Sequence, residues 1–289
     1  TIIDHSSSEI STEDAAVLLE AVRKELENDI YKFYVGTSYR HLTIWDKGEV
    51  VDLTPPHDVL GQKIGQYLPK DDKLREMMKK SYDILSNHPI NVERMKRGLN
   101  PANSLWFWGA GTRPMLTSFE EKTGHKGAMI SAVDLLKGIA VGAGMKVIEV
   151  EGANGGLDTN YEGKADAAVD VLLNGGCDFA YIHLEAPDEM GHQGSYERKV
   201  KAIENLDKRI IKRVVEKMEA AGEDFRMLVL PDHPTPVAIR THVSDPVPYM
   251  LYDSTDKKNN TWSYNEKDGE ASGNYIAEGH TIINRLFEK

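Results

Sequence analysis

Hydrophobic and polar positions predict an α+β arrangement for the first hundred residues. Apolar residues recur at helical spacing over residues 12–26, behind a Ser11-Thr-Glu-Asp14 segment that resembles a capping box. Residues 71–86 and a further segment ending at Asn100-Pro101 are also predicted to be helical. Three short apolar runs between these helices are separated by turn residues and predict a small antiparallel meander: 30–35, 39–45 and 49–53.

The second half of the chain alternates strand-like and helical patterns. The predicted strands are 128–130, 146–150, 179–184, 227–230 and 248–252. The predicted helices between them are 132–143, 163–174 and 196–220, the last with one apolar stripe: Val200, Ile203, Leu206, Ile210, Val214 and Met218. This alternation indicates βαβ units and a parallel sheet with helices on both faces. Residues 256–274 are polar and are expected to form a surface loop before a final helix.

The change of pattern predicts two domains, 1–120 and 121–289, with the boundary between residues 115 and 126. A length of 289 residues suits this number of domains. The chain begins at Thr1 with an apolar Ile-Ile pair, as if partway through a strand. We therefore expect a piece of a longer protein.

Composition narrows the class of protein. The chain is 40% hydrophobic and 28% charged, and no apolar run approaches the roughly 20 residues of a membrane helix. A net charge of −11 disfavours nucleic-acid binding, and a small anionic substrate would need local cations against this charge. Cys177 is the single cysteine, which excludes a disulfide within the chain, and we expect it to be buried. The cytoplasm is the expected compartment.

Imidazole and carboxylate groups follow two of the predicted strands. Asp188 and His192 come after the run ending at residue 184, Asp232 and His233 come after the run ending at residue 230, and His242 follows. Ligands and catalytic groups collect past the carboxyl ends of strands in open α/β sheets. Such mixed donors suit zinc, manganese or iron, and five are too many for one open catalytic site. The set predicts a two-metal site, a type that typically serves phosphoryl transfer.

Each member of the set also has a simpler interpretation. Asp188 is equally suited to capping a helix, and Pro187 and Gly191 favour a loop as much as a helix over this segment. Asp232-His233 between two prolines is typical of a turn. His242 alone indicates little, and the ordered set favours the metal site.

Other candidates surround this set. His183 lies within a predicted strand, as a core residue or one that orients a ligand. Arg113 follows an aromatic run and a glycine-rich turn, where it can be a surface charge or grip a phosphate or carboxylate. Arg40, His41 and His57 gather charge near predicted strand ends. The chain contains none of the glycine-loop motifs that bind nucleotide phosphates, so nucleotide binding has no support.

The motifs around these residues resemble those of the alkaline phosphatase superfamily, and more narrowly the archaeal-type branch of cofactor-independent phosphoglycerate mutases. The metal motifs are Ala-Pro-Asp188-Glu-Met-Gly-His192, Pro-Asp232-His233 and Thr-His242-Val-Ser-Asp-Pro-Val-Pro248. Further segments resemble the branch: Gly36-Thr-Ser-Tyr-Arg-His41, Pro55-Pro-His-Asp58, Ser104-Leu-Trp-Phe-Trp-Gly109 with Arg113-Pro114, and Leu157-Asp-Thr-Asn-Tyr-Glu-Gly163. The resemblance covers nearly the whole chain.

The resemblance implies an alkaline-phosphatase-like parallel sheet flanked by helices, with an inserted α+β substrate-binding domain. It implies two divalent cations, manganese or zinc, and interconversion of 3-phosphoglycerate and 2-phosphoglycerate through a phosphoserine, with no need for 2,3-bisphosphoglycerate. Asp188, His192 and His242 would hold one metal, and Asp232 and His233 part of the other. The inserted domain would clamp the substrate with Arg40, His41, His57 and Arg113.

In the family that this chain resembles, the nucleophilic serine lies in an N-terminal segment before the inserted domain. No serine here follows the expected early strand, so the catalytic serine is expected outside the chain. The isolated chain is expected to be an inactive fragment, and a partner copy is expected to cover its exposed sheet edges as a homo-oligomer. A metal-dependent phosphatase or phosphodiesterase, or a non-catalytic metal-binding module, are the alternatives.

Overall fold

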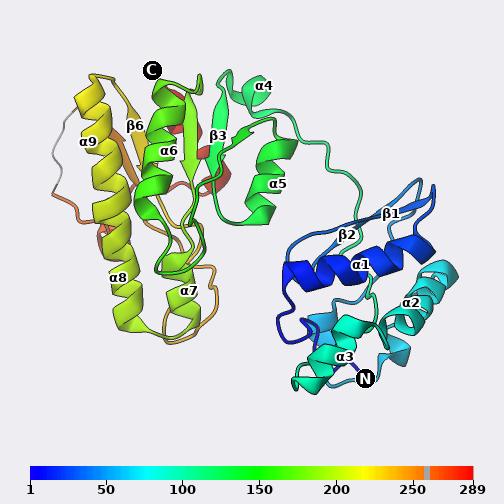
Figure 1. Cartoon of the computed structure of the whole chain (residues 1–289). Coiled ribbons are helices and arrows are strands. Elements are labelled where there is room, and N and C mark those ends of the chain that lie inside the picture. The colour runs from blue at the N-terminus through cyan, green and yellow to red at the C-terminus, as the bar shows by residue number, and fades with distance from the viewer. Residues whose placement is uncertain (257–260, 289) are drawn as a thin grey trace. The chain divides into compact units, whose positions relative to one another are not determined.

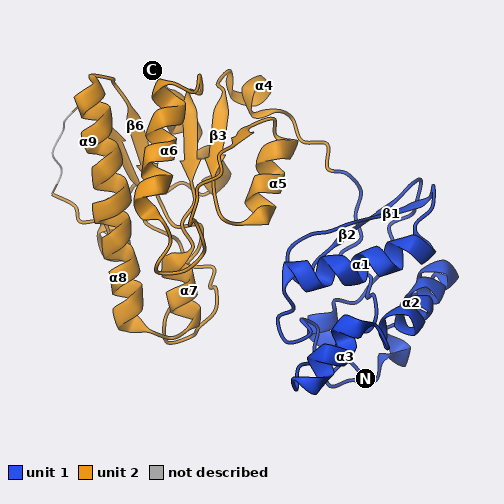
Figure 2. Ribbon diagram, in the orientation of Figure 1, with its two compact units in different colours: residues 1–113 blue, residues 114–289 orange. Residues whose placement is uncertain are grey.

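The computed structural model describes residues 1–256 and 261–288 and divides into two compact units, Thr1–Arg113 and Pro114–Lys289 (Figure 2). The division falls before the predicted boundary at residue 120. Helix α4 (Phe119–Thr123) belongs to the second unit, because Phe119 N donates to Ala143 O at 2.7 Å and its ring stacks on Phe179. The predicted boundary segment is therefore part of the second unit's structure.

In unit 1, helix α1 (Thr12–Leu26) confirms the predicted helix and its cap, because Ser11 Oγ accepts from Asp14 N at 3.1 Å. Strands β1 (Tyr31–Tyr34) and β2 (Leu42–Trp45) form an antiparallel hairpin. The predicted third strand at 49–53 is wrong. Those residues join no ladder, and Val51 and Leu53 instead pack against the core from a loop.

The remaining helices of unit 1 close its core. They are α2 (Asp72–Leu85), α3 (Pro89–Lys96) and the 3-10 turns η1 (Pro56–Val59) and η2 (Ile64–Gln66). Asp71 caps α2 by accepting from Leu74 N, at the predicted start of that helix. The buried core brings α1, β1 and α2 together: Ile10, Leu18, Leu19, Val22, Leu26, Phe33, Leu74 and Leu85.

Unit 2 is built on a parallel sheet flanked by helices, as predicted (Figure 1). Its central strand β3 (Gly127–Ile130) is fully buried and pairs in parallel with β4 (Lys146–Val147) and β5 (Phe179–Ile182). Helices α5 (Asp134–Gly142) and α6 (Tyr161–Leu173) connect these strands. Strand β4 is shorter than predicted, and Cys177 is buried as expected.

A second, antiparallel pair consists of β6 (Arg226–Val229) and β7 (Met250–Asp253). Within the described residues, β5 pairs only with β3 and β6 only with β7. The hydrophobic core nevertheless joins both pairs, since Ile182 from β5 and Met227 from β6 pack against one buried cluster on the helices. The helical layer therefore connects the two sheets.

The predicted helix 196–220 is present, but it contains a π turn. Helix α8 (Tyr196–Leu206) leads into the π segment Asp207–Ile211 and then into α9 (Lys212–Ala221). The predicted apolar stripe is correct for Ile210, Val214 and Met218, which are buried, and wrong for Val200 and Ile203, which are exposed. A π turn adds a residue to the repeat, so the buried face changes phase there.

Two bidentate ion pairs connect this long helix to α6. Arg209 donates to both oxygens of Glu162, and Arg213 donates to both oxygens of Asp166. Lys217 Nζ also lies 2.9 Å from Asp166 Oδ1. These pairs fix the two helices in one register.

The chain ends with α10 (Glu266–Ala271), the 3-10 turn η4 (Gly279–Thr281), and α11 (Asn284–Phe287). The predicted loop 256–274 is therefore interrupted by a helix, whose N-cap Asn265 accepts from Asp268 N. Residues 257–260 of that predicted loop lie outside the described residues. Over the described ranges, no helix is both long and apolar enough to span a membrane.

Candidate metal centre

Helix α7 (Ala186–His192) follows β5 and places the first two candidate ligands on one face. Pro187 occupies the first turn, where its missing N–H costs no hydrogen bond. Asp188 and His192 are four residues apart, and His192 Nε2 lies 3.2 Å from Asp188 Oδ2. Of the two conformations left open by the sequence, the helix is correct.

His242 joins this pair from the connection between β6 and β7. Its Nε2 lies 3.1 Å from His192 Nε2 and 3.3 Å from Asp188 Oδ1. When two donor atoms each lie about 2.0–2.2 Å from one zinc ion, their distance from each other is similar to the separations found here. The three donors are therefore spaced as ligands of a single cation.

Hydrogen bonding directs the lone pair of His192 into this space. His192 Nδ1 lies 3.0 Å from the backbone oxygen of Arg240, which can only accept, so Nδ1 bears the proton of the neutral ring. The Nε2 lone pair then faces His242 Nε2. Arg240 has φ of 60°, a left-handed conformation that is costly for a residue with a Cβ. This strained backbone presents the carbonyl that orients His192.

Asp232 and His233 follow β6 and adjoin the same space. The His233 and His242 ring centroids are 3.7 Å apart, and His233 Nε2 lies 3.4 Å from Asp232 Oδ2. One donor atom each from Asp188, His233 and His242 lie within 4.8 Å of one another, close enough to hold a metal ion. The structure thus brings Asp188, His192, His233 and His242 together, whereas Asp232 is 68% exposed and contacts this group through its sequence neighbour His233. We call Asp188, His192, Asp232, His233 and His242 the donor cluster.

Thr235 is a polar residue of this region that the sequence did not single out. It is 3% exposed, and its hydroxyl donates to Asp188 Oδ1 and lies 3.3 Å from His233 Nδ1. Lys199 Nζ donates to its backbone oxygen at 2.6 Å. The only signal in the sequence was its place two residues after His233, and a threonine after a proline is too common to indicate a role.

A second polar network lies at the end of β5. His183 Nδ1 is 3.3 Å from Ser131 Oγ and 3.5 Å from Glu185 Oε1. Lys164 is fully buried, and its Nζ donates to His183 O at 3.0 Å. Burial lowers the pKa of Lys164, while the charge of Glu185 opposes that shift. His183 is thus joined to the segment leading into α7, three residues before Asp188.

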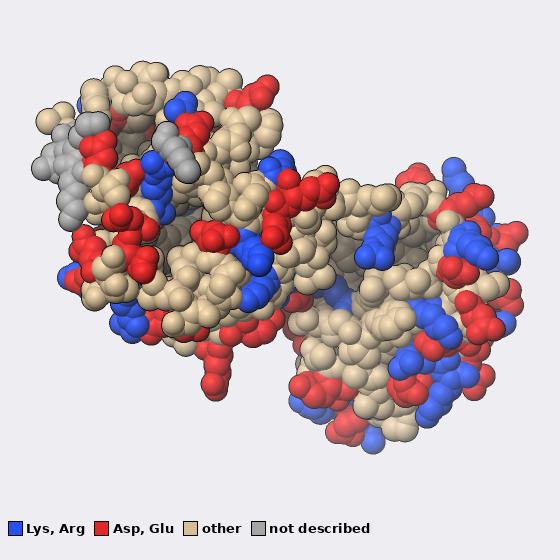
Figure 3. Space-filling model, turned by 90° about the horizontal axis from the view of Figure 1, so that it is seen from above, with Lys and Arg blue, Asp and Glu red and all other residues tan. Residues whose placement is uncertain are grey.

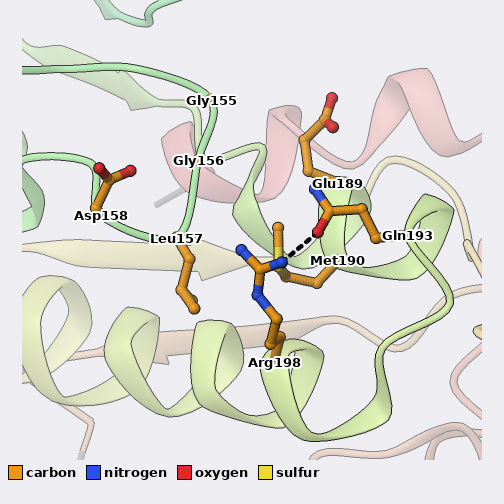
Figure 4. Close-up of a pocket in the computed structure, with 8 residues that line it drawn as sticks. All are labelled: Gly155, Gly156, Leu157, Asp158, Glu189, Met190, Gln193 and Arg198. Carbon is orange, nitrogen blue, oxygen red and sulfur yellow. Dashed lines mark hydrogen bonds between the residues drawn. The ribbon is translucent and has the colours of Figure 1, made fainter.

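A cavity of about 480 Å³ borders the face of α7 that carries Glu189 and Gln193 (Figure 4). Glu189 and Gln193 line it from the helix, opposite the loop of Gly155 to Asp158. Arg198 donates to Gln193 Oε1 at 2.5 Å. Because Glu189 and Gln193 directly follow Asp188 and His192 in sequence, the cavity adjoins α7, the helix that presents two members of the donor cluster.

The predicted substrate residues of unit 1 are only partly brought together. The His57 ring makes edge contacts with Trp108 and His5, and His5 makes an edge contact with Tyr39. The Arg40 guanidinium lies 5.1 Å from the centre of that Tyr39 ring. Arg40 and His57 therefore belong to one aromatic group, in which His5 was missed by the sequence interpretation.

His41 and Arg113 lie differently. His41 Nδ1 accepts from Gly36 N at 3.2 Å, within its own turn, and burial lowers the pKa of the ring. Arg113 is exposed and is the last residue of unit 1. On the face shown in Figure 3, basic and acidic side chains are interspersed over both units.

The fold and the donor cluster define an α/β protein whose histidines and aspartates meet past the carboxyl ends of its strands, as in metal-dependent enzymes. Comparison with known proteins agrees. The Metalloenzyme superfamily profile matches residues 36–280. A 2,3-bisphosphoglycerate-independent phosphoglycerate mutase of Methanosarcina barkeri is 51% identical over 261 residues, covering 89% of this chain and 65% of the relative.

A protein of the same name from Methanothrix thermoacetophila is 41% identical over 287 residues, which cover 98% of this chain and 72% of the relative. The chain belongs to the family of 2,3-bisphosphoglycerate-independent phosphoglycerate mutases, within a superfamily of metalloenzymes. It spans 65% of the length of the Methanosarcina barkeri relative.

Solved structures resemble the fold. A Pyrococcus horikoshii protein superposes with a TM-score of 0.73 at 25% identity, covering 93% of this chain and 67% of that one. A cofactor-independent phosphoglycerate mutase from Thermoplasma acidophilum superposes with a TM-score of 0.65 at 23% identity, covering 99% of this chain and 72% of that one. The second likeness supports the fold alone.

Proposed function

We propose that this chain is the metal-binding and substrate-clamping part of a phosphoglycerate mutase that interconverts 3-phosphoglycerate and 2-phosphoglycerate. The convergence of Asp188, His192 and His242 at 3.1–3.3 Å is the observation that supports it best. Family membership narrows the reaction, because the relatives bear the name of that mutase. The whole enzyme would work without added 2,3-bisphosphoglycerate.

In this proposal, Asp188, His192 and His242 hold one divalent cation, and Asp232 and His233 contribute to a second. Manganese or zinc suits these donors, and the pair would lower the pKa of a nucleophilic hydroxyl and neutralise phosphoryl oxygens. The donor cluster fits such a cation because the Arg240 carbonyl directs the His192 lone pair toward His242.

Unit 1 supplies the cations that an anionic substrate needs. Arg40 and His57 lie in one aromatic group, and His41 and Arg113 complete the proposed set. Charge-assisted hydrogen bonds from Arg40 and Arg113, with hydrogen bonds from the two histidine rings, would hold the carboxylate and phosphate of phosphoglycerate. They would also offset, locally, the overall charge of −11.

The test is an enolase-coupled assay with manganese on the longest product of the parent gene, with an Asp188→Asn variant as control. Formation of 2-phosphoglycerate without 2,3-bisphosphoglycerate is expected in the wild type and not in the variant. Release of free phosphate without 2-phosphoglycerate would replace the mutase with a phosphatase. The isolated chain is expected to bind manganese and to show no turnover, as a metal-binding module would.

A further inference from the structure

Thr235 occupies the point where the two segments of the donor cluster meet. Its hydroxyl touches Asp188 from α7 and His233 from the segment after β6. With 3% exposure, it has little access to water as an alternative partner. A hydroxyl has a single proton to donate, so the direction of each bond follows from its two partners.

The carboxylate of Asp188 accepts only, which assigns the hydroxyl proton to the Thr235–Asp188 bond. The hydroxyl oxygen must then accept from His233 Nδ1, 3.3 Å away. The contact with Thr235 thus favours the form of His233 protonated at Nδ1, whose Nε2 keeps the lone pair that binds a metal. Without metal, Asp232 Oδ2 lies 3.4 Å from His233 Nε2 and favours the opposite tautomer, so the Thr235 hydroxyl decides between the two. Partners of this kind fix the tautomer and ring orientation of metal-binding histidines.

The backbone of Thr235 is itself held by both neighbouring helices. Lys199 of α8 donates to Thr235 O at 2.6 Å. Gly191 of α7 approaches so closely that a Cβ there would lie 2.5 Å from Thr235 O and 3.0 Å from its Cγ2. The glycine lets α7 pack against the threonine, so the position of the hydroxyl relative to Asp188 is set by packing.

We propose that Thr235 is a positioning residue of the metal centre: its hydroxyl couples His233 to Asp188 and selects Nε2 of His233 as the metal-binding atom. This inference rests on the proposed function, because it concerns how the same centre is organised. Nothing in it requires Thr235 to touch metal or substrate.

Two substitutions separate the hydroxyl from the shape of the side chain. Thr235→Val keeps the branched shape and removes the hydroxyl, whereas Thr235→Ser keeps the hydroxyl. The first measurement is the tautomer of His233 from its ring ¹⁵N shifts, in the full chain treated with EDTA. The wild type and Thr235→Ser should show the Nδ1–H form, and Thr235→Val should lose that preference. An unchanged His233 tautomer in the valine variant would overturn the inference.

Manganese affinity, measured by calorimetry on the same three proteins, is the second readout. Thr235→Val should weaken binding by roughly 10–100-fold, and Thr235→Ser should stay within about threefold of the wild type. Equal affinities in the valine variant and the wild type would refute the positioning role. If the wild type bound no manganese, the proposed metal centre itself would fail. That result is distinguishable, because the tautomer is measured without metal.

Discussion

His192 and His242 are fifty residues apart in sequence, yet their Nε2 atoms lie 3.1 Å apart. The other ring nitrogen of His192, Nδ1, donates a hydrogen bond to the backbone carbonyl of Arg240, so the lone pair on Nε2 faces His242. A short α-helix and an irregular connection thus place two metal-type donors side by side, with Asp188 beneath both. This relationship makes the centre testable by single substitutions.

Asp188→Asn should weaken manganese binding by more than about 100-fold, because an amide replaces the carboxylate at the point where His192 and His242 converge. Circular dichroism should remain unchanged, since the side chain of Asp188 is 31% exposed and fills no core. Calorimetric titration measures the affinity. Glu189→Gln, one residue further along α7, is the matched control and should bind manganese normally. Equal affinities in both variants would remove Asp188 from the ligand set.

Arg113→Ala should lower kcat/KM for phosphoglycerate in the full-length enzyme by roughly 10–150-fold, the loss of a charge-assisted contact of about 1.5–3 kcal/mol. Arg113 is exposed, so the thermal midpoint should not change. Steady-state kinetics with 3-phosphoglycerate provide the measurement. An unaltered kcat/KM would make Arg113 an ordinary surface charge.

Asp166→Asn should destabilise the protein at neutral pH by no more than about 1 kcal/mol, because the ion pair with Arg213 is substantially exposed. Hydrogen bonding from Arg213 lowers the pKa of Asp166 from 3.8 to about 2. A depressed folded-state pKa contributes stability above the unfolded value of 3.8, and this contribution disappears as pH falls toward 2.

The stability difference between the wild type and Asp166→Asn should therefore shrink from pH 6 to pH 3. Thermal unfolding at several pH values in that range measures it. Asp170→Asn is a suitable comparison, because Asp170 lies one turn further along α6 and its side chain accepts from the side chain of Asn174, the C-cap residue of that helix. A difference that stays constant with pH would contradict the assignment.

Lys164→Met should destabilise unit 2 by about 1–3 kcal/mol, because it leaves the carbonyl of His183 without its buried donor and removes the positive charge that interacts with Glu185. Glu185→Gln in the same chain should recover part of that loss. Urea unfolding of the wild type, both single variants and the double variant gives the coupling energy. Additive effects of the two substitutions would show that Lys164 and Glu185 do not interact.

Periodic patterns predicted most of the fold, since long helices such as α1 and buried strands such as β3 have strong local signals. The patterns gave the wrong local structure where tertiary contacts determine the conformation. Residues 49–53 alternate like a strand but pack against the core from a loop, and the π turn at Asp207–Ile211 changes the phase of a helix whose sequence remains regular.

The donor cluster could be predicted because its residue types are distinctive and follow strands, and the structure places four of the five together, with Asp232 beside His233. The roles of Thr235 and of the Arg240 carbonyl could not be predicted from the sequence. The first is a common residue whose role depends on a contact across 47 positions, and the second acts through a backbone oxygen that every residue possesses.

Among the residues that the structure describes, β5 and β6 each have one edge without a strand partner, which has a consequence for work with this polypeptide by itself. Each edge offers a row of N–H and C=O groups that another extended chain can hydrogen-bond. In concentrated samples, these edges should therefore pair between molecules and form larger species over time. A short synthetic peptide of strand sequence, added in excess, would compete for these edges and keep the sample dispersed.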